Sequence, residues 1–328
     1  GNKYMRAMLC TTFGGLDGLE LGDIEPPRPE DDEVLIDVSV ASVTYMDYLM
    51  ASGGYQMRPD LPYAPGTDAV GVVRQVGADI TNFKIGDRVA CSNWFGGFAE
   101  QMVAKEWRCA KVPDGVEDAP AVTVLHNYLT AYYALIVRTT LVQDETVFVT
   151  GAAGGVGLAT VEVARKLGGR VIAGIGSDNK AHIVRQAGAS DVVNYRSENL
   201  RDRIKELTDG KGVDVCFDNV GGDVLLQMAR LMNWNGRLMP VGFTSGDIPE
   251  VPMNLPLLKN YSIVGLFSGA WCEKFPKESF LANEVIMDWL AKGDICPHID
   301  RNLPLGGARQ AMQLIVDRAV QGRVVLKI

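Results

Sequence analysis

The chain has 328 residues, enough for about two domains of roughly 150 residues each. Hydrophobic residues make up 47% and charged residues 22%, which is typical of a globular protein and not of a disordered one. The formal net charge of -8 disfavours binding to the phosphate backbone, so we expect no nucleic-acid partner.

No part of the sequence approaches the ~20 continuous apolar residues of a membrane-spanning helix. Residues 1–12 lack the long apolar core of a secretory signal. Both features predict a cytoplasmic protein without a membrane partner. The 6 cysteines are scattered singly, without a CxxC pair, and are expected to be reduced thiols.

Gly and Pro recur at short intervals through residues 1–125, between β-rich runs at 33–40, 69–76 and 88–91. This pattern predicts a small, partly barrel-like β domain. From Glu145 onward, short apolar runs alternate with segments of helical length. The expected strands are 146–150, 170–175, 191–194, 213–218, 236–241 and 263–267. Apolar strands separated by helices are typical of a doubly wound α/β domain with a parallel sheet.

The C-terminal segment does not continue this alternation, because a helix at 307–318 is followed directly by a strand at 323–327. The strand is either an addition to the parallel sheet or a return of the chain to the first domain. Spacing alone leaves both alternatives open.

A glycine-rich turn joins the strand at 146–150 to an apolar-striped helix at 158–167. Gly154 and Gly155 would let the backbone approach a pyrophosphate, and Gly157 would let the helix pack closely. The helix N-terminus adds free N–H groups and a positive dipole. Because the turn follows a strand and opens a helix, it predicts a dinucleotide-binding site.

The end of the second strand of this domain favours NADPH over NADH. Ile175 stands where an NAD-binding fold usually places an acid that holds the ribose hydroxyls. Lys180 follows one turn later and would attract a 2′-phosphate. Asp178 argues against this choice unless it caps the helix that begins near Asn179.

Several segments together resemble the quinone oxidoreductase branch of the medium-chain dehydrogenase/reductase family. They are Met5-Arg6-Ala7-Met8, Pro65 to Val73, Val76-Gly77, Gly86-Asp87-Arg88-Val89, Gly97-Phe98-Ala99-Glu100 and Gly151 to Gly157. The resemblance implies a GroES-like, β-rich catalytic domain (residues 1–125 and 297–328) around a Rossmann NADPH-binding domain (residues 126–296). It thereby favours a return of the C-terminal strand to the first domain.

The zinc-dependent relatives hold the catalytic metal through a Gly-His-Glu histidine and cysteine or acidic ligands. Here Gly66-Thr67-Asp68 occupies the Gly-His-Glu position, and no cluster of four cysteines is present. Zinc requires about four N, S or O ligands. We therefore expect a zinc-independent protein.

The resemblance also implies a set of cofactor contacts. Thr130 would lie near the nicotinamide and phosphates, while Ser177, Lys180 and Tyr195 would grip the 2′-phosphate. Two of the residues have an alternative role. Thr130 could be an ordinary helix residue without a cofactor contact, and Arg318, which would otherwise reach the cofactor, could be a solvated arginine at a helix end. The full set is Thr130, Ala153, Gly154, Gly155, Val156, Gly176, Ser177, Lys180, Tyr195, Asn219, Val220, Val241, Gly242, Phe243, Thr244, Phe267 and Arg318.

The sequence departs from the family at Thr44, where an asparagine that contacts the nicotinamide ribose or the substrate is common. Threonine keeps a donor and an acceptor but has less reach. Thr44, Tyr45, Asp47 and Tyr55 are the catalytic candidates, and a structural, helix-capping role is the alternative for Asp47. The aromatic side chains Tyr45, Tyr55, Phe243, Phe267 and Trp271 would line an apolar pocket for a flat substrate.

The expected activity is hydride transfer from NADPH to a quinone or a related conjugated carbonyl, a small-molecule electrophile, without zinc. One alternative is an enone or enoyl reductase of the alkenal or haloacrylate type. Another is a non-catalytic protein that binds NADPH. The apolar run at 261–267 reads as a late strand at the sheet edge and predicts a homodimer, with a monomer as the alternative.

Overall fold

The structure is a computed structural model that describes residues 3–328 and divides into two units. The first unit contains residues 3–126 and 272–328, and the second contains residues 127–271. The first is rich in β-structure and the second is a doubly wound α/β domain, so the predicted fold class is confirmed. No helix within residues 3–328 combines the length and the apolar character that crossing a membrane requires.

A six-stranded sheet forms the centre of the second unit, and every strand in it runs parallel to its neighbours. In spatial order the strands are β10 (Asp191–Asn194), β9 (Arg170–Ile175), β8 (Thr146–Val149), β11 (Val213–Asp218), β12 (Met232–Pro240) and β13 (Ser262–Ile263). The order reverses between β8 and β11. In open α/β sheets ligands bind at the carboxyl ends of the strands beside such a reversal.

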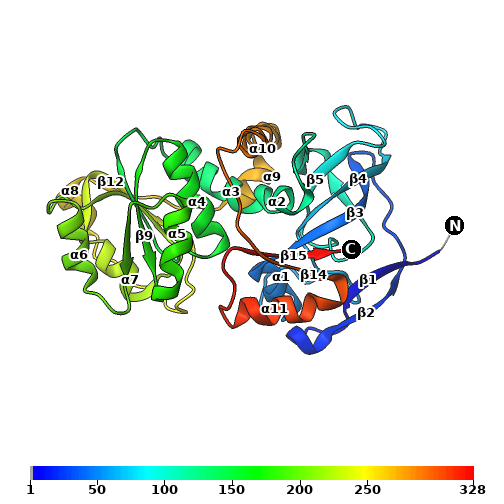
Figure 1. Ribbon diagram of the computed structural model, residues 1–328, viewed down its shortest axis with the longest axis horizontal. Helices are drawn as coiled ribbons and strands as arrows, with labels where there is room; N and C mark the ends of the chain where they lie inside the picture. Colours follow the sequence, from blue (N-terminus) through cyan, green and yellow to red (C-terminus); the bar gives the residue numbers. More distant parts are fainter. Residues whose placement is uncertain (1–2) are drawn as a thin grey trace. The chain divides into compact units, whose positions relative to one another are not determined.

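Helices cover both faces of this sheet, which explains why its strands are apolar on both sides. One face carries α4 (Gly155–Lys166) and α5 (Ala181–Ala187), and the other carries α6 (Leu200–Leu207), α7 (Gly222–Met228) and α8 (Asn254–Lys259) (Figure 1). The buried core between the layers includes Phe148, Ile172, Ile204, Met228 and Leu238.

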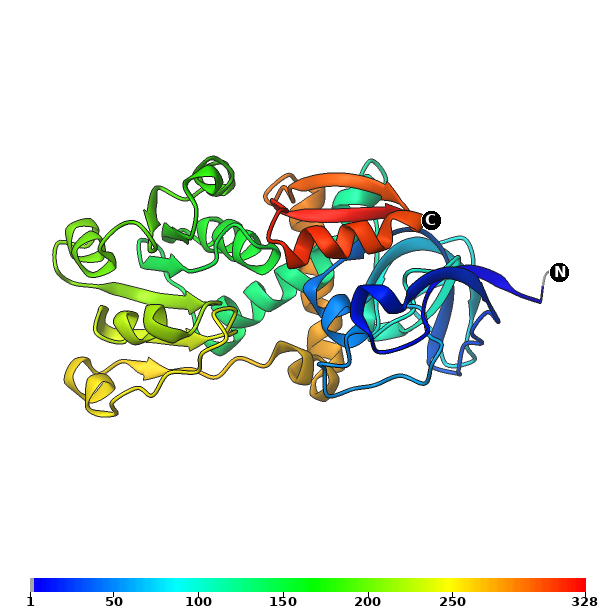
Figure 2. The same cartoon turned by 90° about the horizontal axis from the view of Figure 1, so that it is seen from below.

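The last strand, β13, lies at the sheet edge as predicted, yellow in Figure 2. Its predicted length, residues 263–267, is wrong, because only Ser262 and Ile263 pair with β12. One further bond, from Val264 N to Leu238 O at 2.8 Å, continues the pairing. The chain then leaves the sheet at Gly265 and enters α9 (Ser268–Lys274).

The main sheet of the first unit has seven strands. The order is β14 (Ile299–Pro304), β15 (Arg323–Lys327), β3 (Glu33–Val43), β4 (Asp68–Val76), β5 (Arg88–Ser92) and β7 (Cys109–Lys111), with β6 (Gln101–Lys105) also paired to β3. A separate hairpin consists of β1 (Met5–Cys10) and β2 (Leu19–Ile24). The C-terminal strand thus pairs with β3 and does not join the parallel sheet.

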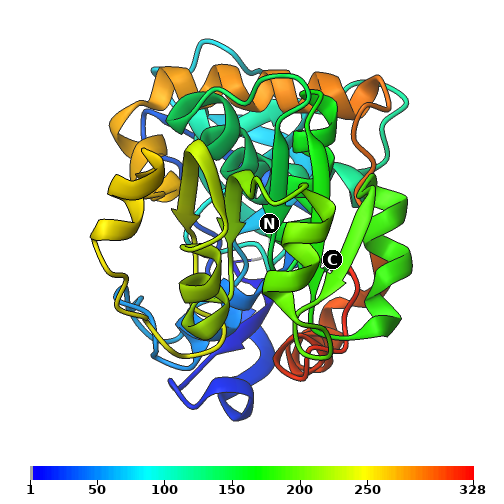
Figure 3. The same cartoon turned by 90° about the vertical axis from the view of Figure 1, so that its left-hand side faces the viewer.

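Helices pack against this sheet or its loops. The apolar stripe of α11 (Ala308–Val316) packs with Met50 of α1 (Tyr45–Ala51) in one buried cluster. The longest described helix, α10 (Pro276–Ala291, orange in Figure 3), contacts β7, and its Phe280 ring lies 6.2 Å from that of Phe83. α10 therefore groups with the first unit, whereas the sequence placed residues up to 296 with the nucleotide-binding segment.

Candidate functional site

The glycine-rich turn lies between β8 and α4. Gly151 has a φ of 56°, a conformation that favours glycine. A Cβ on Gly157 would lie 2.2 Å from the Gly151 carbonyl oxygen, so only glycine allows the helix to start this close to the turn. Gly154 is the N-cap residue of α4 and is exposed, which leaves its backbone accessible to a ligand. The turn thus has the form of a phosphate cradle at a helix N-terminus.

A buried brace that the sequence did not predict fixes this turn to the neighbouring strand. Thr150 Oγ1 donates to Asp218 Oδ1 at 2.6 Å, and Gly221 N donates to Asp218 Oδ2 at 2.7 Å. Asn219 N in turn donates to Thr150 Oγ1 at 2.9 Å. Burial raises the pKa of Asp218, and these hydrogen bonds oppose that effect. The brace holds the predicted contacts Asn219 and Val220 at the carboxyl end of β11.

The loop after β12 is tied to the same strand end. Val241 N donates to Asp218 O at 2.9 Å, and Thr244 N donates to Asn219 O at 3.1 Å. Phe243 is 39% exposed, so its ring is available to a ligand. The structure therefore brings the predicted residues of 219–220 and 241–244 together at one edge of the sheet.

At the end of β9, Ile175 is buried and presents no acid. Ser177 Oγ donates to Asn179 Oδ1 at 2.6 Å in the short 3-10 helix Asp178–Lys180. The predicted capping role of Asp178 is wrong, because α5 begins later and has no side-chain cap. Asp178 instead accepts from Asn194 Nδ2 at 2.9 Å, which links the ends of β9 and β10.

Thr130 lies on α3 (Val124–Tyr132), which continues into a π-helix at Tyr133–Arg138. Its Oγ1 is 3.2 Å from Ser268 Oγ, a hydrogen bond that the sequence did not predict. The π-helix also carries Tyr133, whose ring stacks on Trp271 at 4.9 Å. Trp271 is thus held in a buried stack and is not placed to line an open pocket, whereas Phe267 is 69% exposed.

In the first unit, Thr44 is the N-cap residue of α1 and forms a capping box with Asp47. Thr44 N donates to Asp47 Oδ2 at 2.8 Å, while Asp47 N donates to Thr44 Oγ1 at 3.3 Å. The other carboxylate oxygen of Asp47 accepts from Thr67 N at 3.1 Å. This geometry favours the structural alternative for Asp47, because its carboxylate joins two loops.

Two further charged groups lie close to this box. Asp68 is fully buried, and its Oδ2 is 3.7 Å from Arg323 Nη2. Burial raises the pKa of Asp47 to about 7 and that of Asp68 to about 6. The positive charge of Arg323 lowers the pKa of both carboxyl groups, but the effect of burial is larger.

The remaining candidates of the first unit differ in exposure. Tyr45 is 55% exposed, with its ring 5.8 Å from that of Tyr48. Tyr55 is half-buried, with its ring 6.2 Å from Trp94. Arg318 follows α11, is exposed and has a φ of 56°.

The described side chains around Thr67 and Asp68 do not form a metal site. Across residues 3–328, no three His, Cys, Asp or Glu side chains converge as a metal site. Thr67, beside Asp68, has only a hydroxyl group at the position of the family's zinc-binding histidine. These residues do not fit zinc, which takes about four closely placed ligands.

Comparison with known proteins places both parts of the chain. Residues 30–114 match the alcohol dehydrogenase GroES-like domain, and residues 155–283 match the zinc-binding dehydrogenase family. A quinone oxidoreductase-like protein 2 homolog from Nematostella vectensis is 35% identical over 99% of this chain and 90% of its own length. Human quinone oxidoreductase is 34% identical, over 99% of this chain and 98% of its own. Escherichia coli quinone oxidoreductase, solved with NADPH, superposes with a TM-score of 0.90 at 28% identity, covering 98% of this chain and 100% of its own.

Proposed function

We propose that this chain, which belongs to the quinone oxidoreductase branch of the medium-chain dehydrogenase/reductase family, uses NADPH to reduce a quinone or a related conjugated carbonyl without zinc. The observation that carries the proposal is the carboxyl edge of the parallel sheet. There the glycine cradle lies next to β9, which ends in Ile175 instead of an acid and is followed by Ser177 and Lys180; the Asp178 carboxylate between them accepts from Asn194. This edge suits a dinucleotide with an additional phosphate.

NADPH, when bound, supplies the hydride that reduces the electrophilic carbon. The second unit provides the groups that hold the cofactor. The first unit provides the hydroxyl donors of Thr44, Tyr45 and Tyr55. Thr44 Oγ1 already accepts from Asp47 N, so its own hydrogen is available to donate to a developing substrate oxygen. Asp47 acts as a positioning residue for Thr44, and solvent supplies the final proton.

The donor set of the first unit supports the proposed zinc independence. Thr67 offers a hydroxyl group where the zinc-dependent relatives have the histidine of Gly-His-Glu. The Asp47 carboxylate is occupied by two backbone N–H groups and is not directed to a metal. Reduction of an activated carbonyl does not require the Lewis acid that alcohol oxidation uses.

Steady-state NADPH oxidation on a panel of electrophiles tests the activity. Turnover of 9,10-phenanthrenequinone without turnover of 2-alkenals supports quinone reduction. The reverse preference would assign the chain to the enone and enoyl reductases. Tight NADPH binding without turnover of any electrophile would instead support the non-catalytic alternative.

We further propose a cytoplasmic homodimer formed through the edge strand β13. Ile263 is 40% exposed, and Leu257 and Leu258 of the adjoining α8 are 77% and 64% exposed. An open strand edge beside apolar side chains favours pairing with a second copy, because a two-fold axis satisfies both edges at once. A monomer by light scattering would contradict this.

A further inference from the structure

Arg196 lies at the carboxyl end of β10, beside the end of β9. Asn194 pairs with Ile175 in the sheet, so Arg196 extends past the strand next to Gly176. A Cβ built on Gly176 would lie 3.1 Å from Arg196 Nε and 3.4 Å from Cζ. The guanidinium therefore occupies the space directly over the glycine where the second strand ends.

Hydrogen bonds of Asn194 hold the turn that carries Arg196 next to the end of β9. Asn194 Oδ1 accepts from Arg196 N at 3.0 Å and from Ser197 N at 3.3 Å. The amide nitrogen of the same Asn194 donates to Asp178, which lies next to Ser177. One asparagine thus fixes the backbone of Arg196 relative to the 3-10 helix Asp178–Lys180, which Ser177 precedes.

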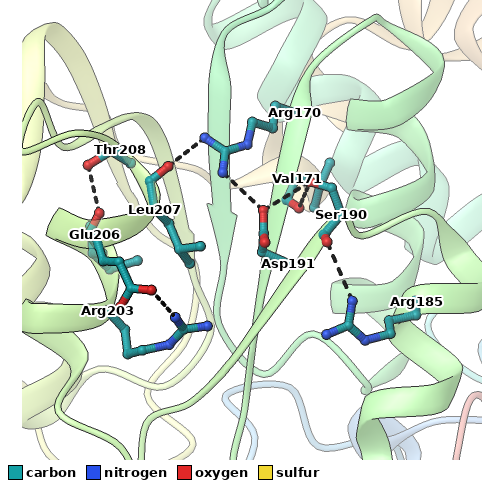
Figure 4. A network of polar contacts seen from close by, with 10 residues as sticks. Arg170, Val171, Arg185, Ser190, Asp191, Arg203, Glu206, Leu207 and Thr208 are labelled. Atoms are coloured by element: carbon teal, nitrogen blue, oxygen red, sulfur yellow. Dashed lines mark hydrogen bonds and ion pairs between the residues drawn. The ribbon is translucent and has the colours of Figure 1, made fainter.

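Arg196 differs from the arginines at the opposite end of the same strands. There Arg170, the first residue of β9, binds Asp191 at 3.0 Å and Leu207 O at 2.6 Å (Figure 4). In that network Arg203 pairs with Glu206, and Arg185 donates to Ser190 O. The guanidinium groups of these arginines are thus bound to groups of the protein itself. Arg196 is exposed, and among residues 3–328 no carboxylate lies within 4.0 Å of its guanidinium.

We propose that Arg196 binds the 2′-phosphate of NADPH together with Lys180 and is a determinant of the preference for NADPH over NADH. The inference rests on the proposed function, which it extends by one residue. A 2′-phosphate carries about -1.5 to -2 charges at pH 7, more than one lysine neutralises. A guanidinium offers two parallel donors to such a group. If Arg196 were only a solvated surface charge, replacing it would not change the affinity for the ligand.

Calorimetric titration of the full chain with adenosine 2′,5′-bisphosphate and with 5′-AMP tests the assignment without measuring turnover. Arg196→Gln keeps a polar side chain but removes its charge and its guanidinium. Because solvent and salt weaken a hydrogen bond between charged groups at an exposed site, we expect the bisphosphate to bind about 5- to 20-fold more weakly. The affinity for 5′-AMP should change less than about twofold. Arg196→Lys should retain part of the affinity.

Arg201→Gln is the matched control, because Arg201 is exposed on the neighbouring α6 and carries the same charge. It should bind both ligands like the unaltered chain. Equal loss of both ligands in Arg196→Gln would mean that the guanidinium stacks on adenine, and would overturn the proposal. Unchanged binding of the bisphosphate in Arg196→Gln would also overturn the proposal. If the unaltered chain itself does not prefer the bisphosphate, the proposed NADPH specificity fails instead.

Discussion

Replacing Asp47 by asparagine should change how the stability of the first unit depends on pH. The Asp47 carboxyl is buried, and its pKa is raised from the ordinary 3.8 to about 7. The folded chain thus holds this proton more tightly than the unfolded chain. Its contribution to stability is full below about pH 4 and is lost as the pH rises through 7. The asparagine side chain of the variant has no such proton.

The size of the effect follows from the two pKa values of Asp47. At 1.36 kcal/mol per pKa unit, their difference corresponds to about 4 kcal/mol in all. Between pH 5.5 and 8.5 the unaltered chain should lose about 2 kcal/mol of this, and Asp47→Asn should lose none of it. For a unit of this size, 2 kcal/mol corresponds to about 4–8 °C in melting temperature.

Thermal unfolding at pH 5.5 and 8.5 measures this difference directly. Asp68 titrates in both proteins, so the difference between the two pH dependences reports the titration of Asp47 together with its interaction with Asp68. Asp114→Asn, at an exposed position, removes the same charge and should keep the pH dependence of the unaltered chain. Equal falls in melting temperature for the unaltered chain and Asp47→Asn would refute the reasoning.

Four further outcomes are expected. Activity should survive dialysis against a chelator, and elemental analysis showing about one zinc per chain, lost with activity, would contradict zinc independence. Lys180→Ala should weaken NADPH binding about 10- to 100-fold and leave NADH nearly unchanged, measured by fluorescence titration. Ser268→Ala should weaken NADPH binding about 2- to 10-fold by releasing Thr130, without lowering the melting temperature by more than about 2 °C. Ile263→Lys should convert a dimer to a monomer in light scattering; Val264 is unsuitable because it is buried within its own chain.

Strands with two buried faces were predicted from the sequence to within a residue or less. The runs at 170–175, 191–194 and 213–218 have the bounds of β9, β10 and β11. Errors arose where the environment changes along a strand. β12 begins at Met232, earlier than predicted, because the polar Asn233 and the 62% exposed Trp234 interrupt the apolar pattern.

Those parts of the site could be predicted from the sequence in which the local backbone geometry permits only one residue type. Gly151 and Gly157 are examples, because backbone approach excludes any side chain there. The brace between Thr150 and Asp218 joins residues that are 68 positions apart, so it depends on β8 and β11 being neighbours. Periodicity does not determine that order, and the roles assigned to individual site residues remain predictions.

The position of β15 affects how the chain folds while it is being synthesised. β15 lies between β14 and β3, so β3 can pair with β4 on one side, while its residues 40–43 have no strand on the other side until residues 324–327 are made. Every strand of the second unit, by contrast, has been synthesised once Ile263 is added. The unit that starts first therefore completes its sheet last. Until then one edge of β3 is open to pairing with other nascent chains.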